Sequence, residues 1–377
     1  MEAMFSQATG PVPPGVLPRG RHGDASHRPQ ATRLARRAGL VAFAALVALA
    51  GALPASAAKG PAAPKPPRPV PAPVAPPPGS AVVIASGLSA PAGQVWMGSH
   101  LWVSDHLLGF CRIDGAAINT GTCSTAAIKP GQPSYDPTTN AVYLPDFSSK
   151  SAGVLRLAFD PINETVGAGT PLAPAAGLGK MRPSATTLGP DGSLYVGTLK
   201  DANVWRITAP SGPAPTAQTA ATAAAGIVGM AFAGTDLYLV DTVAVTKVAN
   251  ATGTASGVAV PAAGITAAAP TAIASDGARI YIANTPGAVA PAGGGAATGG
   301  ASDILRYTVS TNKQILLSSG VVTFDAKNRP KTTAFQNVSG LAVDGAGNLY
   351  VADDPNAFAA TPPAVPTGQM YKIGPVP

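Results

Sequence analysis

The stretch Gly340-Leu341-Ala342-Val343-Asp344-Gly345-Ala346-Gly347-Asn348-Leu349-Tyr350-Val351-Ala352-Asp353 decides the fold of this chain. It consists of a short apolar run, a turn rich in Asp, Gly and Asn, a second apolar run centred on an aromatic residue, and a terminal carboxylate. Turn residues of this kind between two short apolar runs predict a pair of antiparallel strands.

The second half of this phrase recurs along the chain. Its six copies are Leu101–Asp105, Val142–Asp146, Leu194–Thr198, Leu237–Asp241, Ile280–Asn284 and Leu349–Asp353. Their central aromatic residues, from Trp102 to Tyr350, are separated by 41, 52, 43, 43 and 69 residues. A repeat of about 40–45 residues that carries four strands is typical of a β-propeller blade. The two longer steps contain insertions, at 163–180 and 286–300.

Each copy is interpreted as four strands, with an inner strand before the aromatic strand and a third and an outer strand after it. The last copy stops at its third strand, Met370–Ile373, whereas an extra strand, Ala81–Ala85, precedes the first inner strand. We therefore predict an all-β, six-bladed β-propeller over residues 80–377, closed by pairing of the N-terminal strand with the C-terminal blade. Such closure removes the unpaired edges through which open sheets aggregate.

The phrase at 340–353 resembles the NHL repeat, and the other copies resemble weaker versions of it. The resemblance extends over 80–377 and implies a six-bladed ring. Similar rings include binding scaffolds, gluconolactonase-type lactonases and streptogramin B lyases, so the resemblance is specific for the fold and leaves the function open.

Residues 1–57 have the composition of a secretory signal peptide. Arginines precede an apolar stretch, Gly39–Leu53, and the small residues Ala55-Ser56-Ala57 follow it. This order predicts cleavage near Ala57 and a periplasmic or secreted protein. The alternative is a membrane anchor, but about 15 residues rise only about 22 Å as a helix, less than the roughly 30 Å of a bilayer core. The pair Arg36-Arg37 leaves the Sec and twin-arginine routes open, and the long segment before the apolar stretch indicates a later translation start.

Residues 58–79 form a linker of Pro and Ala with scattered basic residues. Such a run favours extended polyproline II and cannot bury a core. We expect a semi-rigid spacer, with recognition by a proline-binding module as the alternative.

The basic character of the chain belongs largely to the predicted signal peptide. Six of the 25 Lys and Arg residues and two of the 18 Asp and Glu residues lie in 1–57, which leaves a mature charge of about +3. No cluster of basic residues follows, so nucleic acid is not expected as a partner. The mature chain is also expected to have no transmembrane span.

Cys111 and Cys123 are the two cysteines of the chain. They flank a segment that reads as two short strands around a Gly and Asn turn, and a disulfide across such a hairpin satisfies the short Cα separation that the bond requires. A redox pair is the alternative, but it would favour a CxxC spacing.

A small polar residue ends each aromatic strand: Asp105, Asp146, Thr198, Asp241, Asn284 and Asp353. Because the copies are equivalent, we expect these residues at one mouth of the channel. Their oxygen atoms could bind a divalent cation, Ca²⁺ or Mg²⁺, or each side chain could cap its own turn, as the resemblance to NHL repeats implies. The strongest metal candidates are Asp353 and Asp354, with Asp105, Asp146, Asp241 and Asn284 as further candidates. The aromatic residues are expected to pack between blades rather than to bind a ligand.

His106 is the candidate general base. Only His100 and His106 follow residue 57, and His106 comes directly after Asp105, where it can face the channel mouth. His100 is expected in a tight turn, and an exposed loop position is the alternative for His106. By resemblance, a streptogramin-type lyase would use a histidine and an acid near Mg²⁺. The chain has no GxSxG, HExxH or phosphate-loop motif.

The lactonase interpretation meets one mismatch. By resemblance, gluconolactonase-type propellers hold their metal with an early glutamate, asparagines and an aspartate, but the corresponding stretch Leu88–Trp96 contains no acid. The one glutamate after residue 57, Glu164, lies in an insertion. The sequence therefore favours an exported binding or protein-interaction scaffold for an unknown protein or small-molecule ligand. A divalent-metal-dependent lactonase or lyase with its site at the channel mouth is the alternative.

Overall fold

The computed structural model describes residues 80–124, 128–148, 153–172, 178–241, 243–253, 257–285, 301–324, 330–354 and 367–375. The chain divides into two units, 1–70 and 71–377, and all described residues belong to the second. The predicted signal peptide (1–57) and linker (58–79), and the insertion at 286–300, lie outside the described residues. Within the described ranges no helix has the length and apolarity needed to cross a membrane.

The described chain is built almost entirely of strands, which form five hydrogen-bonded sheets. The first contains β1 (Ala81–Leu88), β2 (Pro91–Met97), β3 (His100–Asp105), β4 (Gly109–Asp114), β5 (Ala117–Ser124), β24 (Gly320–Phe324), β25 (Pro330–Ala334), β26 (Val338–Val343), β27 (Leu349–Asp353) and β28 (Gly368–Ile373). The second contains β6 (Ser134–Asp136), β7 (Ala141–Pro145), β8 (Val154–Asp160), β9 (Thr165–Val166) and β10 (Thr170–Pro171). The third contains β11 (Pro183–Leu188), β12 (Leu194–Thr198), β13 (Asn203–Thr208), β14 (Thr216–Thr222) and β18 (Gly257–Val258). The fourth contains β15 (Ile227–Ala233), β16 (Asp236–Asp241), β17 (Val245–Val248) and β19 (Val260–Pro261), and the fifth β20 (Pro270–Ser275), β21 (Arg279–Asn284), β22 (Asp303–Thr308) and β23 (Lys313–Ser318). Two 3₁₀ turns, η1 (Leu178–Met181) and η2 (Val309–Thr311), complete the set.

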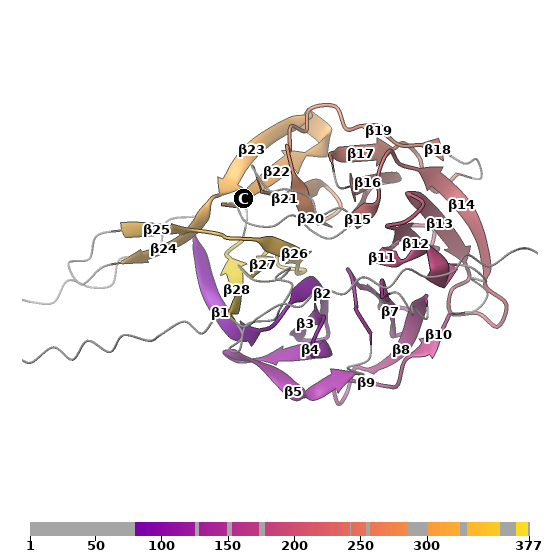
Figure 1. Ribbon diagram of the computed structural model, residues 1–377, viewed down its shortest axis with the longest axis horizontal. Helices are drawn as coiled ribbons and strands as arrows, with labels where there is room; N and C mark the ends of the chain where they lie inside the picture. The colour runs from indigo at the N-terminus through magenta and orange to yellow at the C-terminus, as the bar shows by residue number, and fades with distance from the viewer. Residues whose placement is uncertain are drawn as a thin grey trace, which may run out of the picture. The chain divides into compact units, whose positions relative to one another are not determined.

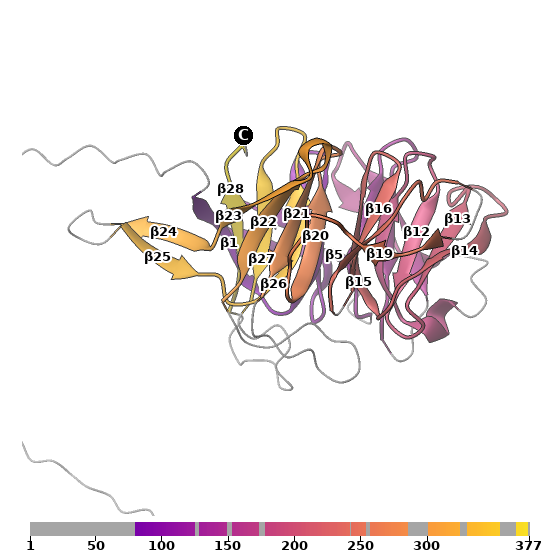
Figure 2. The same ribbon diagram turned by 90° about the horizontal axis from the view of Figure 1, so that it is seen from above.

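The sheets are arranged in a ring, as Figure 1 shows, and they form a β-propeller. The space enclosed by their innermost strands is called the channel. The strands whose residues line the central cavity are β2, β6, β11, β15, β20 and β26, and we call them the inner strands. Each inner strand ends the hydrogen-bonded order of its sheet, so one of its backbone edges is not used for pairing within that sheet. In both views the hairpin of β24 and β25 projects away from the rim (Figures 1 and 2).

The phrase that decides the fold owes its shape to turn chemistry. The Asp344 carboxylate accepts hydrogen bonds from the Ala346 N–H (2.9 Å), the Asn348 amide (2.7 Å) and the Tyr350 hydroxyl (3.0 Å). Gly347 has φ +80°, a conformation that glycine adopts without strain. These contacts close the turn between β26 and β27, which pair antiparallel with Leu341 opposite Val351.

The aromatic residues of the repeat are core residues. Trp102, Tyr143, Tyr195, Tyr238, Tyr281 and Tyr350 are all at most 4% exposed. Tyr281, for example, lies in one apolar cluster with Val338 and Leu341 of the next inner strand. The Tyr195 hydroxyl donates a hydrogen bond to the Ala251 carbonyl (3.0 Å). Burial of large aromatic faces between neighbouring sheets therefore holds the ring together.

The two ends of the described chain pair in one sheet. β1 runs antiparallel to β28, with Val82 opposite Lys372 and Val83 opposite Tyr371.

The Cys111–Cys123 disulfide is present and joins β4 to β5, with the two Cα atoms 4.1 Å apart, which confirms the predicted pairing.

Glycine residues let the segments at the starts of neighbouring inner strands approach each other closely. A Cβ atom on Gly131 would lie 1.8 Å from the Ser184 carbonyl oxygen, and one on Gly93 would lie 2.5 Å from the Cα of Gln132. Gly340 would meet Gly93 at 3.2 Å. Backbone therefore packs against backbone here, and we call this level of the channel the waist.

Candidate functional site

The small polar residues that end the aromatic strands lie at one end of the ring. Each stands opposite the start of its inner strand, as in the pairs Pro91 with Asp105 and Val338 with Asp353. We call this end the carboxylate mouth. The residues at the corresponding positions are Asp105, Asp146, Thr198, Asp241, Asn284 and Asp353.

Asp105 shows what these side chains do locally. It is 0% exposed, and its carboxylate accepts four backbone N–H groups: Ser89 (2.7 Å), Ala90 (3.0 Å), Leu107 (2.9 Å) and Leu108 (3.1 Å). The carboxylate thus ties the loop before the inner strand to the turn after the aromatic strand.

The other members make similar bonds. Asp146 accepts the N–H groups of Lys129 (3.1 Å) and Ser148 (3.0 Å). Asp241 accepts the N–H groups of Val243 (2.8 Å) and Ala244 (2.7 Å). In the fifth sheet, the Asn284 amide oxygen accepts the Ala269 N–H (3.0 Å). Thr198 differs because its hydroxyl donates, to the Asp201 carboxylate and to the Asn203 carbonyl (2.9 Å).

Asp353 and Asp354 are the strongest metal candidates in the sequence, and both are buried. The Asp353 carboxylate accepts the N–H groups of Gln336 (3.0 Å) and Asn337 (2.6 Å). Burial raises the pKa of Asp353; the two N–H groups oppose that shift, and the neighbouring Asp354 adds to it. Asp354 accepts the Thr367 hydroxyl at 2.8 Å.

A divalent cation is not well matched to these residues. The carboxylate oxygens already accept backbone N–H groups, and their lone pairs point at those donors. In the ranges that the structure describes, no group of three or more His, Cys, Asp or Glu side chains could hold a metal ion. A Ca²⁺ or Mg²⁺ site at the carboxylate mouth stays a prediction, and no chemistry is derived from it below.

His106 lies at the carboxylate mouth, directly after Asp105. Its backbone N–H donates to the Ala90 carbonyl (2.9 Å), and its ring packs edge-on against Phe147, with 4.7 Å between the ring centroids. Its Nε2 atom is buried and has no hydrogen-bond partner. Burial lowers the pKa of His106 to about 4. The Asp105 carboxylate and a hydrogen bond with the Pro130 backbone oppose the shift, and Lys129 adds to it. His106 is therefore a neutral imidazole at pH 7.

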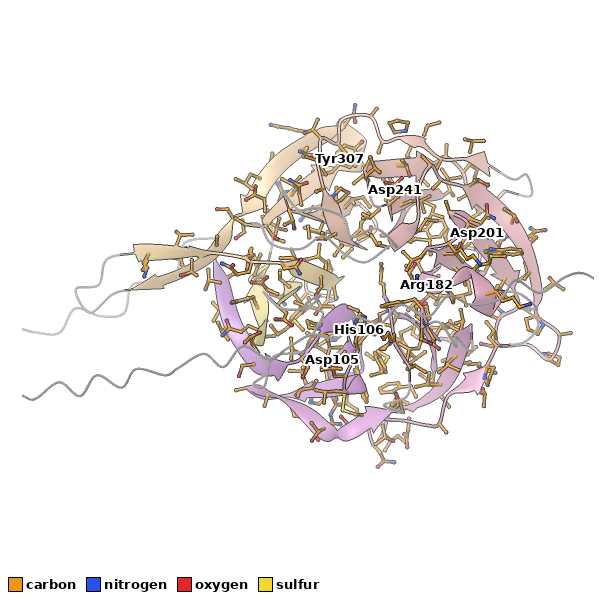
Figure 3. All side chains as sticks on the ribbon, in the orientation of Figure 1. Asp105, His106, Arg182, Asp201, Asp241 and Tyr307 are labelled. Carbon is orange, nitrogen blue, oxygen red and sulfur yellow. A yellow bond between two sulfur atoms is a disulfide. The ribbon has the colours of Figure 1, made fainter. Side chains whose placement is uncertain are left out.

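Cationic side chains accompany this histidine. Arg182 has φ +58° and donates from Nε to the carbonyl oxygen of Phe147 (3.1 Å), the residue that packs on His106. Lys129 is exposed, and its charge lowers the pKa of the imidazole. Figure 3 shows that His106 and Arg182 lie toward the centre of the ring, whereas Tyr307 lies farther out. The mouth thus combines a neutral base with two positive charges.

The opposite end of the channel has a different character. Here the inner strands turn into the aromatic strands, and we call this end the turn mouth. A cavity of about 320 Å³ opens there, lined by residues from every inner strand. Its half-buried rim consists of Trp96, Tyr135, Leu188, Phe232, Ser275 and Val343.

Two glutamine amides lie in this cavity. The Gln132 amide donates to the Met230 carbonyl (2.8 Å), and its oxygen accepts the Met230 N–H (3.0 Å), so it satisfies the backbone edge of β15. Gln94 is 3% exposed and donates to the Tyr350 carbonyl (2.7 Å). The predictions from sequence missed both residues. They stand out in one respect, because most residues at equivalent inner-strand positions are apolar or small.

Glu164 was also missed, because it contacts residues far away in the sequence. Its carboxylate accepts the N–H (2.7 Å) and the hydroxyl (2.8 Å) of Ser99 and contacts Nδ1 of His100. Arg112 donates to the Glu164 carbonyl (2.9 Å) and pairs with Asp114 (2.6 Å). Burial opposes ionisation of Glu164, but the Ser99 and His100 contacts hold its pKa below its ordinary value. This polar cluster ties the β2–β3 turn to the insertion after β8.

Solved structures that resemble this chain are also β-propellers. The PQQ-bound aldose sugar dehydrogenase of Streptomyces coelicolor is 17% identical, with a TM-score of 0.50 over 78% of this chain and 97% of that one. A putative gluconolactonase is 12% identical, with a TM-score of 0.52 over 78% and 91%. An auxiliary nutrient binding protein of Bacteroides thetaiotaomicron is 12% identical, with a TM-score of 0.52 over 76% and 69%. Such identities show a shared fold alone. No protein-family model and no curated protein match the chain.

Proposed function

We propose that this protein is an exported β-propeller that hydrolyses a small cyclic ester at the carboxylate mouth, with His106 as the general base. The observation that carries the proposal is the buried, unpartnered Nε2 of a histidine that is neutral at pH 7. A neutral imidazole near the charge of Lys129, with Arg182 bonded to the neighbouring Phe147 carbonyl, suits a reaction that consumes water and develops negative charge. The fold shared with a putative gluconolactonase supports this class of substrate.

In the proposed reaction, the ester and its attacking water displace the side chains that cover His106 Nε2. This nitrogen then accepts a proton from the water while the water oxygen bonds to the ester carbonyl carbon. The negative charge that develops on the carbonyl oxygen is stabilised by the cationic side chains of the mouth. The ring C–O bond then breaks, and the imidazolium returns its proton to the leaving alkoxide. The product is an open-chain hydroxy acid.

We further infer that the sheets make six blades in a closed ring. The six inner strands line one cavity, and β1 pairs with β28. In this interpretation the ten-stranded sheet is two blades joined through β1 and β5, which pair at Ser86 and Ala117. The NHL-like character of the repeats, export and cleavage near Ala57 are part of the same proposal. N-terminal sequencing of the protein recovered outside the cytoplasm tests the cleavage site.

The activity is tested with glucono-δ-lactone and γ-butyrolactone in a pH-stat. The His106→Gln variant should lose about 100-fold or more in kcat/KM, the range usual for a general base. His100→Gln is the matched control, because His100 lies at the other end of the ring in a polar cluster. Wild-type rate should persist down to about pH 4, where His106 becomes protonated. The predicted cation is tested by adding a chelator. If the chelator abolishes hydrolysis and added Ca²⁺ or Mg²⁺ restores it, the reaction requires a metal ion. Equal rates for His106→Gln and wild type would overturn the proposal.

Ligand binding without turnover is the second candidate. It is favoured by the engagement of Asp105 and Asp353 in backbone hydrogen bonds, which leaves the mouth with structural rather than reactive carboxylates. The fold shared with a nutrient binding protein supports it. A lactone or its hydroxy acid that binds with no turnover in wild type would favour this candidate over the hydrolase.

A further inference from the structure

The tyrosine hydroxyls of successive repeats differ at the fourth sheet. Tyr143 of the second sheet is hydrogen-bonded to the hydroxyl of Ser211 (2.6 Å), and Tyr195 of the third sheet donates to the carbonyl of Ala251 (3.0 Å). Both partners lie in the turn that follows the third strand of the next sheet. Tyr238 is the equivalent residue of the fourth sheet, but among the described residues no hydrogen bond joins it to the corresponding turn after β22. The fourth copy therefore lacks a contact that the two preceding copies make.

The turn after β22 is held by another tyrosine. The hydroxyl of Tyr307 donates to the Asn312 amide oxygen (2.7 Å) and to the Ala263 carbonyl (3.3 Å). The rings of Tyr238 and Tyr307 lie 6.1 Å apart between centroids and are tilted by 55°. The polar groups that would meet the Tyr238 hydroxyl are thus bonded to Tyr307 instead.

A cavity of about 270 Å³ lies at this position, between the fourth and fifth sheets and in the outer part of the ring, where Figure 3 labels Tyr307. Its floor is formed by the buried residues Tyr238 (1% exposed), Tyr307 and Ala262. Its rim includes the half-buried Lys247 and the exposed Asn312, so the cavity opens to solvent on one side. The volume is just below the usual range for small-molecule sites, about 300–1,000 Å³, so it suits a small ligand.

Tyr238 supplies a hydrogen-bond donor to this cavity. Burial raises the pKa of Tyr238 to about 12; the neighbouring Tyr307 hydroxyl, through charge and hydrogen bonding, and the Asp236 carboxylate add to the shift. The phenol is therefore protonated at neutral pH, and its O–H can rotate toward a ligand oxygen. A carboxylate oxygen is a stronger acceptor than a phenol oxygen, so a bound carboxylate would receive this hydrogen bond in place of Tyr307.

Lys247 adds a second donor, which carries a positive charge. Its Nζ pairs with the Asp236 carboxylate at 3.1 Å, which occupies one of its three N–H groups, and Asp236 also accepts the Asn250 N–H (2.9 Å). None of the residues that line the cavity is acidic. The two donors therefore suit an anionic oxygen rather than a cation.

The rest of the lining is apolar. Ala262, Ala263 and Val309 contribute to it, and Ala262 and Val309 belong to the same apolar cluster as the rings of Tyr238 and Tyr307. Such a surface accommodates a hydrocarbon or aromatic group, because it removes apolar area of the ligand from water. The cavity thus has a polar end with two donors beside an apolar wall.

We propose that the cavity between the fourth and fifth sheets binds a small organic monocarboxylate, which accepts hydrogen bonds from the Tyr238 hydroxyl and the Lys247 ammonium group while its apolar part packs on Tyr307. None of these residues takes part in the proposed hydrolysis. The site is therefore independent of the function proposed for the carboxylate mouth.

The test is calorimetric titration of the mature protein at pH 7 with benzoate, and with benzamide as the uncharged control of the same shape. Benzoate should bind, and its dissociation constant should be lower than that of benzamide by about tenfold or more, because hydrogen bonds to a charged acceptor are the stronger ones. His106→Gln should bind benzoate with unchanged affinity, so the result is separate from the fate of the proposed hydrolysis.

Four variants address the contacts. Tyr238→Phe keeps the buried ring and removes the hydroxyl, and it should weaken benzoate binding by about tenfold. Tyr195→Phe is the matched control, because the Tyr195 hydroxyl bonds to Ala251 outside the cavity, and it should leave the affinity unchanged. Lys247→Met should remove the preference for benzoate over benzamide. Ala263→Trp, at an exposed rim position, should abolish binding by filling the cavity.

Thermal unfolding of each variant establishes that it is folded before its affinity is compared. The proposal is overturned if benzoate does not bind, if benzamide binds equally well, or if the affinity for benzoate survives both Tyr238→Phe and Ala263→Trp.

Discussion

The two mouths of the channel are made by opposite ends of the same inner strands, yet they treat polar groups differently. At the carboxylate mouth the acidic side chains accept hydrogen bonds from the backbone, and Asp105 alone accepts four backbone N–H groups. At the turn mouth the ends are closed by tight turns, and a buried amide oxygen of Gln94 is left without a donor. The difference shows that the repeated polar residue stabilises the ring, whereas the non-repeated His106 is the candidate for contact with a bound molecule.

The largest expected effect is at the carboxylate mouth. Asp105→Ala leaves four backbone N–H groups without their acceptor, and it should lower the free energy of unfolding by about 3–5 kcal/mol. Denaturant unfolding measures the change. The matched control is Asp136→Ala in the β6–β7 turn at the other mouth, where the carboxylate is more exposed and accepts only from Thr138 and Thr139. That control should cost about 1 kcal/mol or less. Equal losses would show that the two mouths do not differ in this way.

The waist gives the next largest effect. Gly131→Ala places a methyl group 1.8 Å from the Ser184 carbonyl oxygen, so the strands must separate, and we expect a loss of about 1–3 kcal/mol or more. Gly345→Ala is the control, since a Cβ there meets nothing within 4 Å. Thermal unfolding of the two variants compares them. A tolerated Gly131→Ala would mean that the inner strands are not in contact at this level.

The pH dependence of the free energy of unfolding should have opposite signs for Asp353 at the carboxylate mouth and Glu164 near the turn mouth. The pKa of Asp353 is raised above its ordinary 3.8, so its stabilising contribution is complete below that pH and is lost as the pH rises through the folded-state value. The pKa of Glu164 is lowered from 4.5, so its contribution is present above 4.5 and is lost as the pH falls through the folded-state value.

The matched variants are Asp353→Asn and Glu164→Gln, measured by denaturant unfolding between pH 3 and 7. As the pH rises, the free energy of unfolding of Asp353→Asn should increase relative to wild type, and that of Glu164→Gln should decrease relative to wild type. Each change should be on the order of 1 kcal/mol. Parallel pH profiles would contradict the assigned environments.

The remaining pH effect concerns His106. Because its pKa falls from 6.5 to about 4, its neutral form contributes stability above pH 6.5 that is lost as the pH falls through 4. His106→Gln should flatten the stability profile in that window, and His100→Gln serves as its histidine control. Nuclear magnetic resonance of the imidazole protons gives the pKa directly. A value near 6.5 for His106 would place its ring in solvent.

Strand positions could be predicted because they depend on local signals. The alternation in Leu349–Asp353 and the turn at Asp344 are properties of neighbouring residues, and the structure has β27 and its turn at those positions. The cysteine pairing was predictable for the same reason, since a hairpin brings Cys111 and Cys123 together. The number of blades and the closure of the ring remain proposals.

The candidate sites could be predicted only in part. The position of His106 follows from its place after Asp105, but its pKa depends on burial by segments such as Phe147 and Lys129. The contacts of Glu164 with Ser99 span 65 positions in the sequence. Gln132 reaches Met230 across 98 positions. No pattern among neighbouring residues indicates contacts between residues so far apart in the sequence.

The sequence by itself determined a repeated strand-and-turn unit, the end of the ring at which its polar residues gather, and one disulfide. All of these follow from hydrogen bonds and packing between residues close in the chain. Only the tertiary structure decided which polar atoms are already bonded and which are not. That depends on how strands from distant parts of the chain approach one another, so it could turn the six repeated polar residues into structural groups while leaving His106 Nε2 and several other buried polar atoms of the described residues without a hydrogen bond.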